Sequence, residues 1–319
     1  MDQVVRYRSR MSDSGRWKGF EFRDGDVVIS TPSKCGTTWM QNLVSMLLLG
    51  DEPLHRPMAE VSPWMDMLLD TKEHVHGLLA AQQHRRFIKT HTPLDGLPFD
   101  ERVHYVFVGR DPRDQWLSWE HHFDNMDMER LVEHYVRVLQ NDPEAAALVA
   151  EVAGDSPEPP PSPTRHEDPI VRFRTYVDEI SDDGSVSANL GHLVHHTRTF
   201  WDRAHLPNVT MFHYGDMLAD LPGQIRRLAD ALGVEVDDET VARLAARGTF
   251  ASMKERAEVL APNTNHQAWK DTSAFFHRGT SGQWTELLGP DDVAHFHKRL
   301  RERAGSDELA AWIERGTLG

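Results

Sequence analysis

Residues 26–48, DVVISTPSKCGTTWMQNLVSMLL, place a strand pattern, a tight loop and a helix pattern in immediate succession. Valine and isoleucine fill the first run, Pro32 and Gly36 punctuate the loop, and apolar residues recur at three- and four-residue spacing from Thr38 to Leu49. A short run that is apolar without alternation suits a strand buried on both faces. The stretch therefore predicts a parallel strand that feeds directly into a helix.

Three further apolar runs predict more strands of this kind, at Phe87–Thr90, His104–Gly109 and Val209–Tyr214. The first strand is predicted at Asp26–Ser30, and a second helical pattern covers Met217–Leu232 before Gly233. Because strands alternate with helices, we expect an α/β chain: a three-layer, P-loop-like fold with a central parallel sheet flanked by helices. No clean boundary divides the 319 residues, so we expect a single domain over residues 1–319.

Residues 142–168 interrupt this alternation. An alanine-rich piece is followed by GDSPEPPPSPTRHED, whose prolines lack backbone N–H groups and favour extended backbone. We expect a flexible, exposed insertion rich in proline and acidic residues. Two interpretations stay open for it: a solvated loop, or a flap over a substrate site.

The charge balance narrows the class of partner. Lysine and arginine total 35 against 50 acidic residues, a formal charge of −15, which on average repels a nucleic-acid backbone. Hydrophobic residues make up 39% and charged residues 27%, as in globular proteins. No apolar run approaches the roughly 18 residues that span a bilayer, and the N-terminus lacks the apolar core of a secretory signal. We expect a cytoplasmic enzyme without integral membrane association.

Cysteine and histidine content argues against a metal centre. The single cysteine, Cys35, excludes an intramolecular disulfide and any site built from several cysteines. Among the 19 histidines, His192 and His196 form HxxxH without the glutamate of a zinc protease. We expect most histidines at the surface and no metal.

The loop of residues 31–36 has the composition of an anion site. The first N–H groups of a helix lack partners inside the helix, so Gly36, Thr37 and Thr38 can donate to a phosphate, and Lys34 adds a positive charge. A nucleoside-triphosphatase loop has its lysine directly after the second glycine, whereas here lysine precedes the glycine by two positions. An ordinary strand-to-helix turn capped by threonine fits the same residues and stays open.

Two later segments place cations beside turns. Arg110 follows a predicted strand and Ser118 lies eight residues on, so both can reach one oxyanion. The segment FFHRGTSGQW sets His277 and Arg278 beside Gly279, and glycine lets the backbone approach a ligand closely. Taken singly, these segments are also typical of a surface salt bridge and a basic turn.

Taken in this order, the segments resemble the cytosolic-type sulfotransferase family, whose donor is 3′-phosphoadenosine 5′-phosphosulfate, along nearly the whole chain. The resemblance to the family motif TYPKSGTTW implies a loop for the 5′-phosphosulfate made of Lys34, Cys35, Gly36, Thr37, Thr38 and Trp39. The arginine and serine of the second motif correspond to Arg110 and Ser118, which by analogy hold the 3′-phosphate. HRGTSGQWT is similar to the third motif, RKGxxGxWK, and implies further donor contacts from His277, Arg278 and Gly279.

Three shorter motifs add to this resemblance. FIKTHTP is similar to the family's KTHLP, which makes Lys89 the counterpart of the active-site lysine and His91 that of the catalytic base. FHYGDM implies that Tyr214 lies near the adenine. GTFASM resembles TSFxxM, and the resemblance implies that Phe250 and Trp39 sandwich the adenine beside Met253. A composition rich in histidine, arginine and acidic residues suggests a high-GC bacterial, actinobacterial member.

The chain also departs from the family pattern. Cys35 replaces a serine of the family motif. Two interpretations stay open: it is a small residue where space is tight, or it is a reactive thiol whose pKa is lowered by the helix start. His277 and Arg278 replace an Arg-Lys pair, which predicts a weaker or pH-dependent phosphate clamp. Gly289 and Pro290 occupy the Thr-Val positions of the family's dimerisation motif, so that dimer is not carried over and the oligomeric state stays open.

The resemblance implies in-line transfer of a sulfonate group without a metal. His91 would accept the proton of the acceptor hydroxyl, Lys34 would stabilise the leaving phosphate, and Lys89 the sulfonate oxygens. Apolar residues predict a hydrophobic acceptor (a lipid or glycolipid, a sterol or a phenol); they lie in Met58–Leu79 and at Trp116, Trp119, Phe123, Met126 and Met128. Core packing is the other interpretation for most of them.

Two other classes stay open at this point. One is an atypical P-loop kinase that needs ATP and Mg²⁺. The other is a nucleotide-binding protein without catalysis, against which Lys34, Lys89 and His91 together speak.

Overall fold

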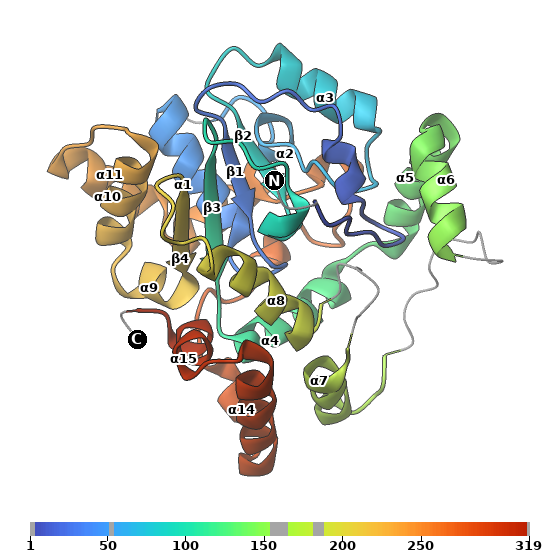
Figure 1. Cartoon of the computed structure of the whole chain (residues 1–319), viewed down its shortest axis with the longest axis vertical. Coiled ribbons are helices and arrows are strands. Elements are labelled where there is room, and N and C mark those ends of the chain that lie inside the picture. Colours follow the sequence, from blue (N-terminus) through green and yellow to red (C-terminus); the bar gives the residue numbers. More distant parts are fainter. Residues whose placement is uncertain (1–3, 51–53, 154–164, 181–187, 318–319) are drawn as a thin grey trace.

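A four-stranded parallel sheet forms the centre of the computed structural model, which describes residues 4–50, 54–153, 165–180 and 188–317. The strands follow the order β2-β1-β3-β4 (Figure 1) and are β1 Val27–Ser30, β2 Phe87–Thr90, β3 His104–Gly109 and β4 Val209–His213. The predicted strands are confirmed, and only the ends of β1 and β4 differ, by one residue each.

Both faces of the sheet are buried, which explains the absence of alternation in the strand sequences. In β1, Val28 packs into one hydrophobic cluster, while Val27 and Ile29 pack into another on the opposite face. In β3, Tyr105 and Phe107 belong to the first cluster. Because successive side chains point to opposite faces and both faces are buried, apolar residues follow one another without alternation.

Helices cover the sheet on both sides, which confirms the predicted three-layer α/β fold (Figure 1). One face is covered by α1 Thr37–Leu49, α2 Met58–Val61, α9 Tyr214–Ala219, α10 Leu221–Leu232, α11 Asp238–Arg247, α12 Phe250–Glu255 and α13 Ala257–Leu260. The other face is covered by α3 Lys72–Ala81, α4 Pro112–Asn125, α7 Pro169–Asp178, α8 Leu190–Trp201, α14 Pro290–Ala304 and α15 Asp307–Arg315. Short 3₁₀ turns lie at Ser14–Trp17, Leu94–Gly96, Thr264–His266, Ser273–Phe275 and Gln283–Glu286.

The helix predicted over Met217–Leu232 is in fact two helices, α9 and α10. Asp220 ends α9, and its side chain accepts a hydrogen bond from the backbone of Gly223 at the start of α10. Pro222 occupies the first turn of α10, where a missing N–H costs nothing. Local capping therefore divides a continuous apolar pattern.

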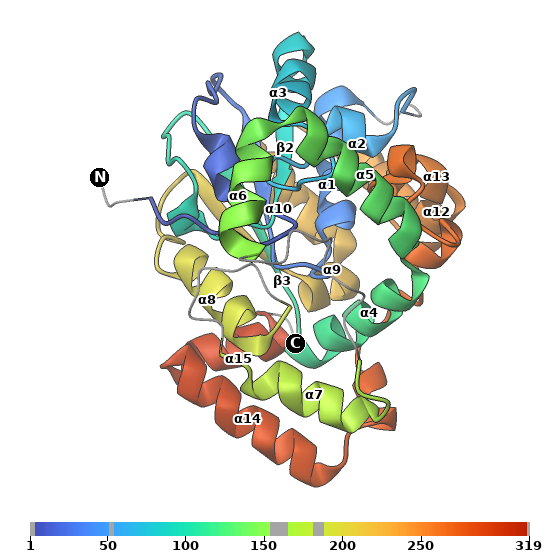
Figure 2. The same ribbon diagram turned by 90° about the vertical axis from the view of Figure 1, so that its right-hand side faces the viewer.

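Part of the predicted flexible insertion is helical. α5 Met128–Asn141 and α6 Pro143–Ala153 form a hairpin at the side of the molecule (Figures 1 and 2). The insertion prediction is therefore wrong for residues 143–153, because Ala145, Leu148 and Val149 share one helical face and are buried in a third cluster with α5. Residues 154–164, which hold the prolines, lie outside the described residues.

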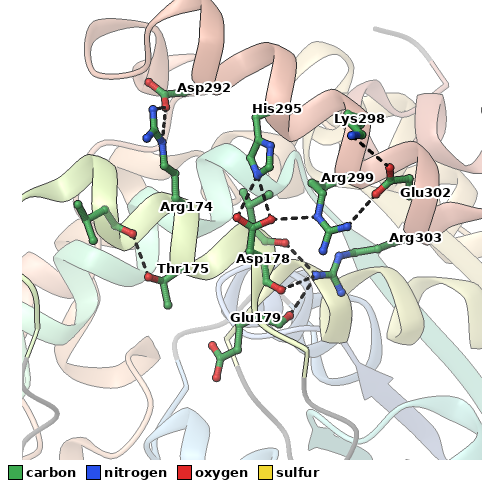
Figure 3. Close-up of polar contacts among 12 residues, drawn as sticks. Arg174, Thr175, Asp178, Glu179, Asp292, His295, Lys298, Arg299, Glu302 and Arg303 are labelled. Atoms are coloured by element: carbon green, nitrogen blue, oxygen red, sulfur yellow. Dashed lines mark hydrogen bonds and ion pairs between the residues drawn. The ribbon is translucent and has the colours of Figure 1, made fainter.

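α7 lies along α14 (Figure 2) and is fastened to it by polar contacts. These contacts, drawn in Figure 3, join Arg174 to Asp292 at 2.8 Å, and Asp178 to His295 and Arg299 at 2.9 and 3.0 Å. On α7, Phe173 packs against Trp116 of α4 with 4.9 Å between ring centroids. The α7–α14 pair thus supports the back of α4, whose other face carries site residues.

The prediction that most histidines lie at the surface is wrong. His91, His104, His196, His213 and His266 are buried, and several others are half-buried. Neutral imidazole packs well in a core once hydrogen-bonded, as His196 is to the Ser30 hydroxyl at 2.8 Å. Within the described part of the chain, no helix is long and apolar enough to cross a bilayer.

Candidate active site

A cavity of about 680 Å³ opens at the carboxyl ends of β1 and β3. β2 and β3 lie on opposite sides of β1, so the strand order reverses there and leaves a crevice between the following loops. The cavity is lined by all the predicted site residues except Cys35, namely Lys34, Gly36, Thr37, Thr38, Trp39, Lys89, His91, Arg110, Ser118, Tyr214, Phe250, Met253, His277, Arg278 and Gly279. The fold thus brings together motifs that are far apart in sequence.

The start of α1 favours the anion site over the capped turn. Gly36 occupies the N-cap position with φ 106°, and no side chain caps the first turn within the described structure. The Thr37 hydroxyl instead bonds to the Thr31 hydroxyl at 2.5 Å. A Cβ at Gly36 would also lie 3.1 Å from the Tyr214 ring. The first N–H groups of α1 are therefore available to an anion.

Two lysines face this helix start, of which Lys89 is buried and Lys34 is half-buried. The Lys34 ammonium donates to His122 Nδ1 at 2.9 Å and lies 4.4 Å from the Phe275 ring centroid, while the Lys89 ammonium lies 3.5 Å from that of Trp64. In the described part of the chain neither lysine has a carboxylate within ion-pair distance. Burial, and then neighbouring cations, lower the pKa of Lys34 to about 7, and burial lowers the pKa of Lys89 to about 7. Two such lysines suit a multiply charged anion, which would favour their charged forms.

Arg110 stands directly after β3 and reaches the same loop. One of its terminal nitrogens donates to the Lys34 carbonyl at 3.0 Å, and the guanidinium lies 4.2 Å from the Tyr214 ring centroid. Its Nε is buried without a partner among the described residues. By contrast Arg113, one turn further on, pairs with Asp111 and Glu314. Arg110 therefore has donor capacity left for a ligand, whereas Arg113 is structural.

The third motif is held against α4. The Gly282 N–H donates to both carboxylate oxygens of Asp114 at 3.0 Å. Gly279 has φ 68°, and a Cβ there would lie 2.2 Å from the Phe250 ring, so only glycine fits. His277 stacks on His121 at 3.8 Å between centroids, and burial followed by the His121 charge lowers its pKa. Arg278 is therefore the cation of this loop at neutral pH.

His91 has the geometry of a general base. Its Nδ1 lies 2.6 Å from the Thr31 carbonyl oxygen, which can only accept, so Nδ1 carries the hydrogen and Nε2 keeps its lone pair. The Trp64 ring stands perpendicular to the imidazole at 4.7 Å. Burial, and next the Lys89 charge, hold the pKa of His91 well below its ordinary value. The imidazole is therefore neutral at pH 7 and can take a proton.

Cys35 departs from the expectation for a donor-binding side chain. It is completely buried in the cluster that contains Trp116 and Phe173, and burial raises the pKa of its thiol to about 12. Lys34 lines the cavity, whereas its neighbour Cys35 lies in the core. Of the two open interpretations, the structure supports a small packing residue.

The Cys35 thiol should be inert in the native protein. We expect iodoacetamide at pH 8 to alkylate it at least about 100-fold more slowly than in the urea-unfolded chain, because a thiol with raised pKa forms little thiolate. Mass spectrometry of quenched samples measures both rates on the single cysteine. Comparable native and unfolded rates would contradict the buried placement.

The apolar residues proposed for the acceptor fall into two groups. Trp116 packs in the core and does not line the cavity, so that prediction is wrong. The same cavity is also lined by a mostly apolar set, namely Met11, Trp64, Met67, Trp119, Phe123, Met126, Met128, Leu131, Val132, Tyr135, Trp269 and Phe275. From Met58–Leu79, only Trp64, Asp66 and Met67 reach it.

Sequence reasoning missed His122. It lies four residues after Ser118 on α4, the spacing at which two side chains share one helical face. That signal was present in the sequence. The approach of Lys34 to His122 depends on tertiary contact between the loop and α4, which no local pattern reports.

These features define a site for a nucleotide that carries several negative charges, with a neutral histidine at its edge. A profile of the sulfotransferase domain family matches residues 24–307. The chain belongs to this family, and it is a sulfotransferase that uses 3′-phosphoadenosine 5′-phosphosulfate as donor.

Relatives of known name support this assignment. Glycolipid sulfotransferases of Mycobacterium bovis and Mycobacterium tuberculosis are each 39% identical, over 100% of this chain and 96% of theirs. Bovine sulfotransferase 1E1 is 24% identical over 88% of this chain and 85% of its own. The fold matches a mouse sulfotransferase solved with the product adenosine bisphosphate, with TM-score 0.67, 17% identity and coverage of 95% and 93% of the two chains.

Binding of 3′,5′-adenosine bisphosphate should be linked to proton uptake. Lys34 and Lys89 have pKa values of about 7 in the free protein, and bound phosphates raise them. Below pH 7 both ammonium groups are already present; above pH 7 each must gain a proton, so affinity should fall by up to about tenfold per pH unit for each lysine. Calorimetry from about pH 7 to about pH 9, in buffers of different ionisation enthalpy, measures affinity and proton uptake together. Affinity independent of pH would contradict this.

Proposed function

We propose that this sulfotransferase transfers sulfonate to a hydroxyl group of a glycolipid, with His91 as the base. The observation that carries the proposal is that one cavity is lined both by the polar donor residues with His91 and by the apolar set given above, which we call the acceptor chamber. Its volume of about 680 Å³ falls within the range of small-molecule sites, roughly 300–1,000 Å³. A glycolipid fits both parts of the cavity, because its sugar hydroxyl would lie at His91 and its alkyl chains in the apolar chamber.

The chamber favours an alkyl chain over a polar acceptor. It is built by the segment between α2 and α3, the end of α4, and α5, which contribute Met67, Met126 and Met128 among other residues. Methionine side chains adapt their shape to flexible apolar ligands. Each methylene removed from water contributes about 0.8 kcal/mol, so the chains would supply most of the affinity. The names of the mycobacterial relatives point to the same class of acceptor.

The transfer step follows from the placement of three side chains. His91 Nε2 accepts the proton as the acceptor oxygen bonds to sulfur, while the bond from sulfur to the phosphate oxygen breaks and the electron pair leaves with adenosine bisphosphate. Lys34 and the N–H groups at the start of α1 stabilise charge on the leaving phosphate. Lys89, beside His91, stabilises the sulfonate oxygens. The roles of Arg110, Ser118, Tyr214 and the third motif in holding the nucleotide belong to the same proposal.

The acceptor is tested by comparing a glycolipid with its parts. We expect sulfonate transfer to an intact glycolipid with kcat/KM at least about 100-fold above that for the free sugar headgroup, since the latter lacks the buried chains. A sterol and a simple phenol serve as competing acceptors. Equal efficiency with headgroup and glycolipid, or a preference for the phenol, would overturn the glycolipid assignment and leave the sulfotransferase activity in place.

The chamber itself is tested by Met128→Asp, with Val171→Asp as the control. Met128 lines the chamber, whereas Val171 is an exposed valine on α7. We expect the first change to raise KM for the glycolipid at least about tenfold, because a carboxylate would meet the alkyl chain, and the control to leave it unchanged.

We also propose that this protein is located in the cytoplasm.

A further inference from the structure

His122 connects the donor lysine to the acceptor chamber. It lies on the cavity face of α4, and its Nδ1 accepts a hydrogen bond from the Lys34 ammonium at 2.9 Å. The same imidazole packs among the aromatic rings of the chamber, 4.8 Å from Trp269, 5.3 Å from Trp119 and 5.8 Å from Phe275 between centroids. One side chain thus contacts both halves of the site.

The protonation state of His122 fits an acceptor of hydrogen bonds. Burial, and then the Lys34 charge, hold the pKa of His122 well below its ordinary value, so the ring is neutral. When Lys34 is charged, its ammonium group can only donate, so Nδ1 is the acceptor and the ring hydrogen sits on Nε2. Lys34 has three N–H donors and uses one here, which leaves two for an anion.

The contact restrains a lysine that would otherwise be mobile. A lysine side chain is a flexible four-carbon stem, and fixing it costs rotamer entropy. Here the hydrogen bond to His122 and the Phe275 ring hold the ammonium before any ligand arrives. Preorganised charges stabilise a transition state without reorganisation at the moment of reaction.

We propose that His122 is a positioning residue that holds Lys34 in line with the leaving phosphate and connects this lysine to the aromatic wall of the acceptor chamber. The proposal rests on the proposed function, in which Lys34 stabilises the leaving group. It goes beyond that function, because His122 touches neither reacting centre and acts through Lys34. A filled acceptor chamber then fixes the His122 ring, and with it the lysine.

Two substitutions separate positioning from packing. His122→Asn keeps an acceptor atom near the place of Nδ1, whereas His122→Leu fills similar space without one. With saturating donor and acceptor, we expect His122→Leu to lower kcat on the order of tenfold, and His122→Asn to stay within about threefold of the wild type. His134→Leu is the matched control: this half-buried histidine of α5 packs on His266 outside the cavity, and kcat should not change.

The possible outcomes distinguish the two proposals. Equal losses in both His122 variants, or full activity of His122→Leu, would overturn the positioning role. Binding of the bisphosphate by calorimetry should persist in both variants; if the wild type itself fails to bind it, the proposed function fails.

A measurement independent of turnover tests the contact. In protein labelled with ¹⁵N-histidine, we expect His122 as the Nε2–H tautomer at neutral pH, with an Nδ1 resonance that shifts in Lys34→Met. The Nδ1–H tautomer, or a resonance unaffected by Lys34→Met, would overturn the proposal even if the enzyme is inactive on every acceptor tried.

Discussion

The His91→Ala variant is expected to lose most of its turnover, by about 10²- to 10⁴-fold, and to keep its affinity for 3′,5′-adenosine bisphosphate. The reason lies in two contacts of the imidazole. The Thr31 carbonyl fixes the hydrogen on Nδ1, and burial with the Lys89 charge keeps the ring neutral. Nε2 therefore keeps its lone pair and can accept a proton. Release of the bisphosphate during sulfonate transfer measures kcat, and calorimetry measures the affinity.

The pH profile gives a second test of the same residue. A base must be unprotonated, and the pKa of His91 lies well below 6.5, so activity limited by this group should fall only at pH values well below 6.5. The acidic limb should be absent from the residual activity of His91→Ala. Full activity of the variant, with the bisphosphate affinity retained, would assign the base to another residue.

The Arg110→Ala variant should lose affinity for 3′,5′-adenosine bisphosphate by about 10- to 150-fold, the range expected for a hydrogen bond to a charged group. Arg110 is buried and bonds to the Lys34 carbonyl, but its Nε has no partner among the described residues. A phosphate group at this point would use that capacity and pair with a cation already fixed against Tyr214. Calorimetric titration of both proteins measures the loss.

Arg113→Ala is the matched control for this prediction. Arg113 lies three residues further on, in the first turn of α4, and is also buried, but its nitrogens are taken by Asp111 and Glu314. Its removal should lower the melting temperature, because Asp111 and Glu314 lose the guanidinium that pairs with both, and should leave the bisphosphate affinity within about threefold. A binding isotherm of Arg110→Ala that equals that of the wild type would remove the 3′-phosphate assignment.

The sequence alone determined the elements and the motifs. The runs at β1, β2, β3 and β4 are mostly apolar and do not alternate, because the sheet is covered on both faces, and this signal is local. The loop before α1 was predicted as an anion site because it leads directly into a helix. The backbone N–H groups at a helix start can bind an anion without particular side chains. The order of the motifs was sufficient to predict the family.

Only the tertiary structure decided which atoms are free to act. The tautomer of His91 depends on the Thr31 carbonyl, the core position of Cys35 on packing around Trp116, and the hydrogen bond of Lys34 on His122. The burial of α6 likewise depends on α5. Local patterns fix the period of a strand or helix, but the partner on each face comes from segments far along the chain. Solvation and hydrogen bonding, and with them the pKa of each group, are therefore set only when those segments meet.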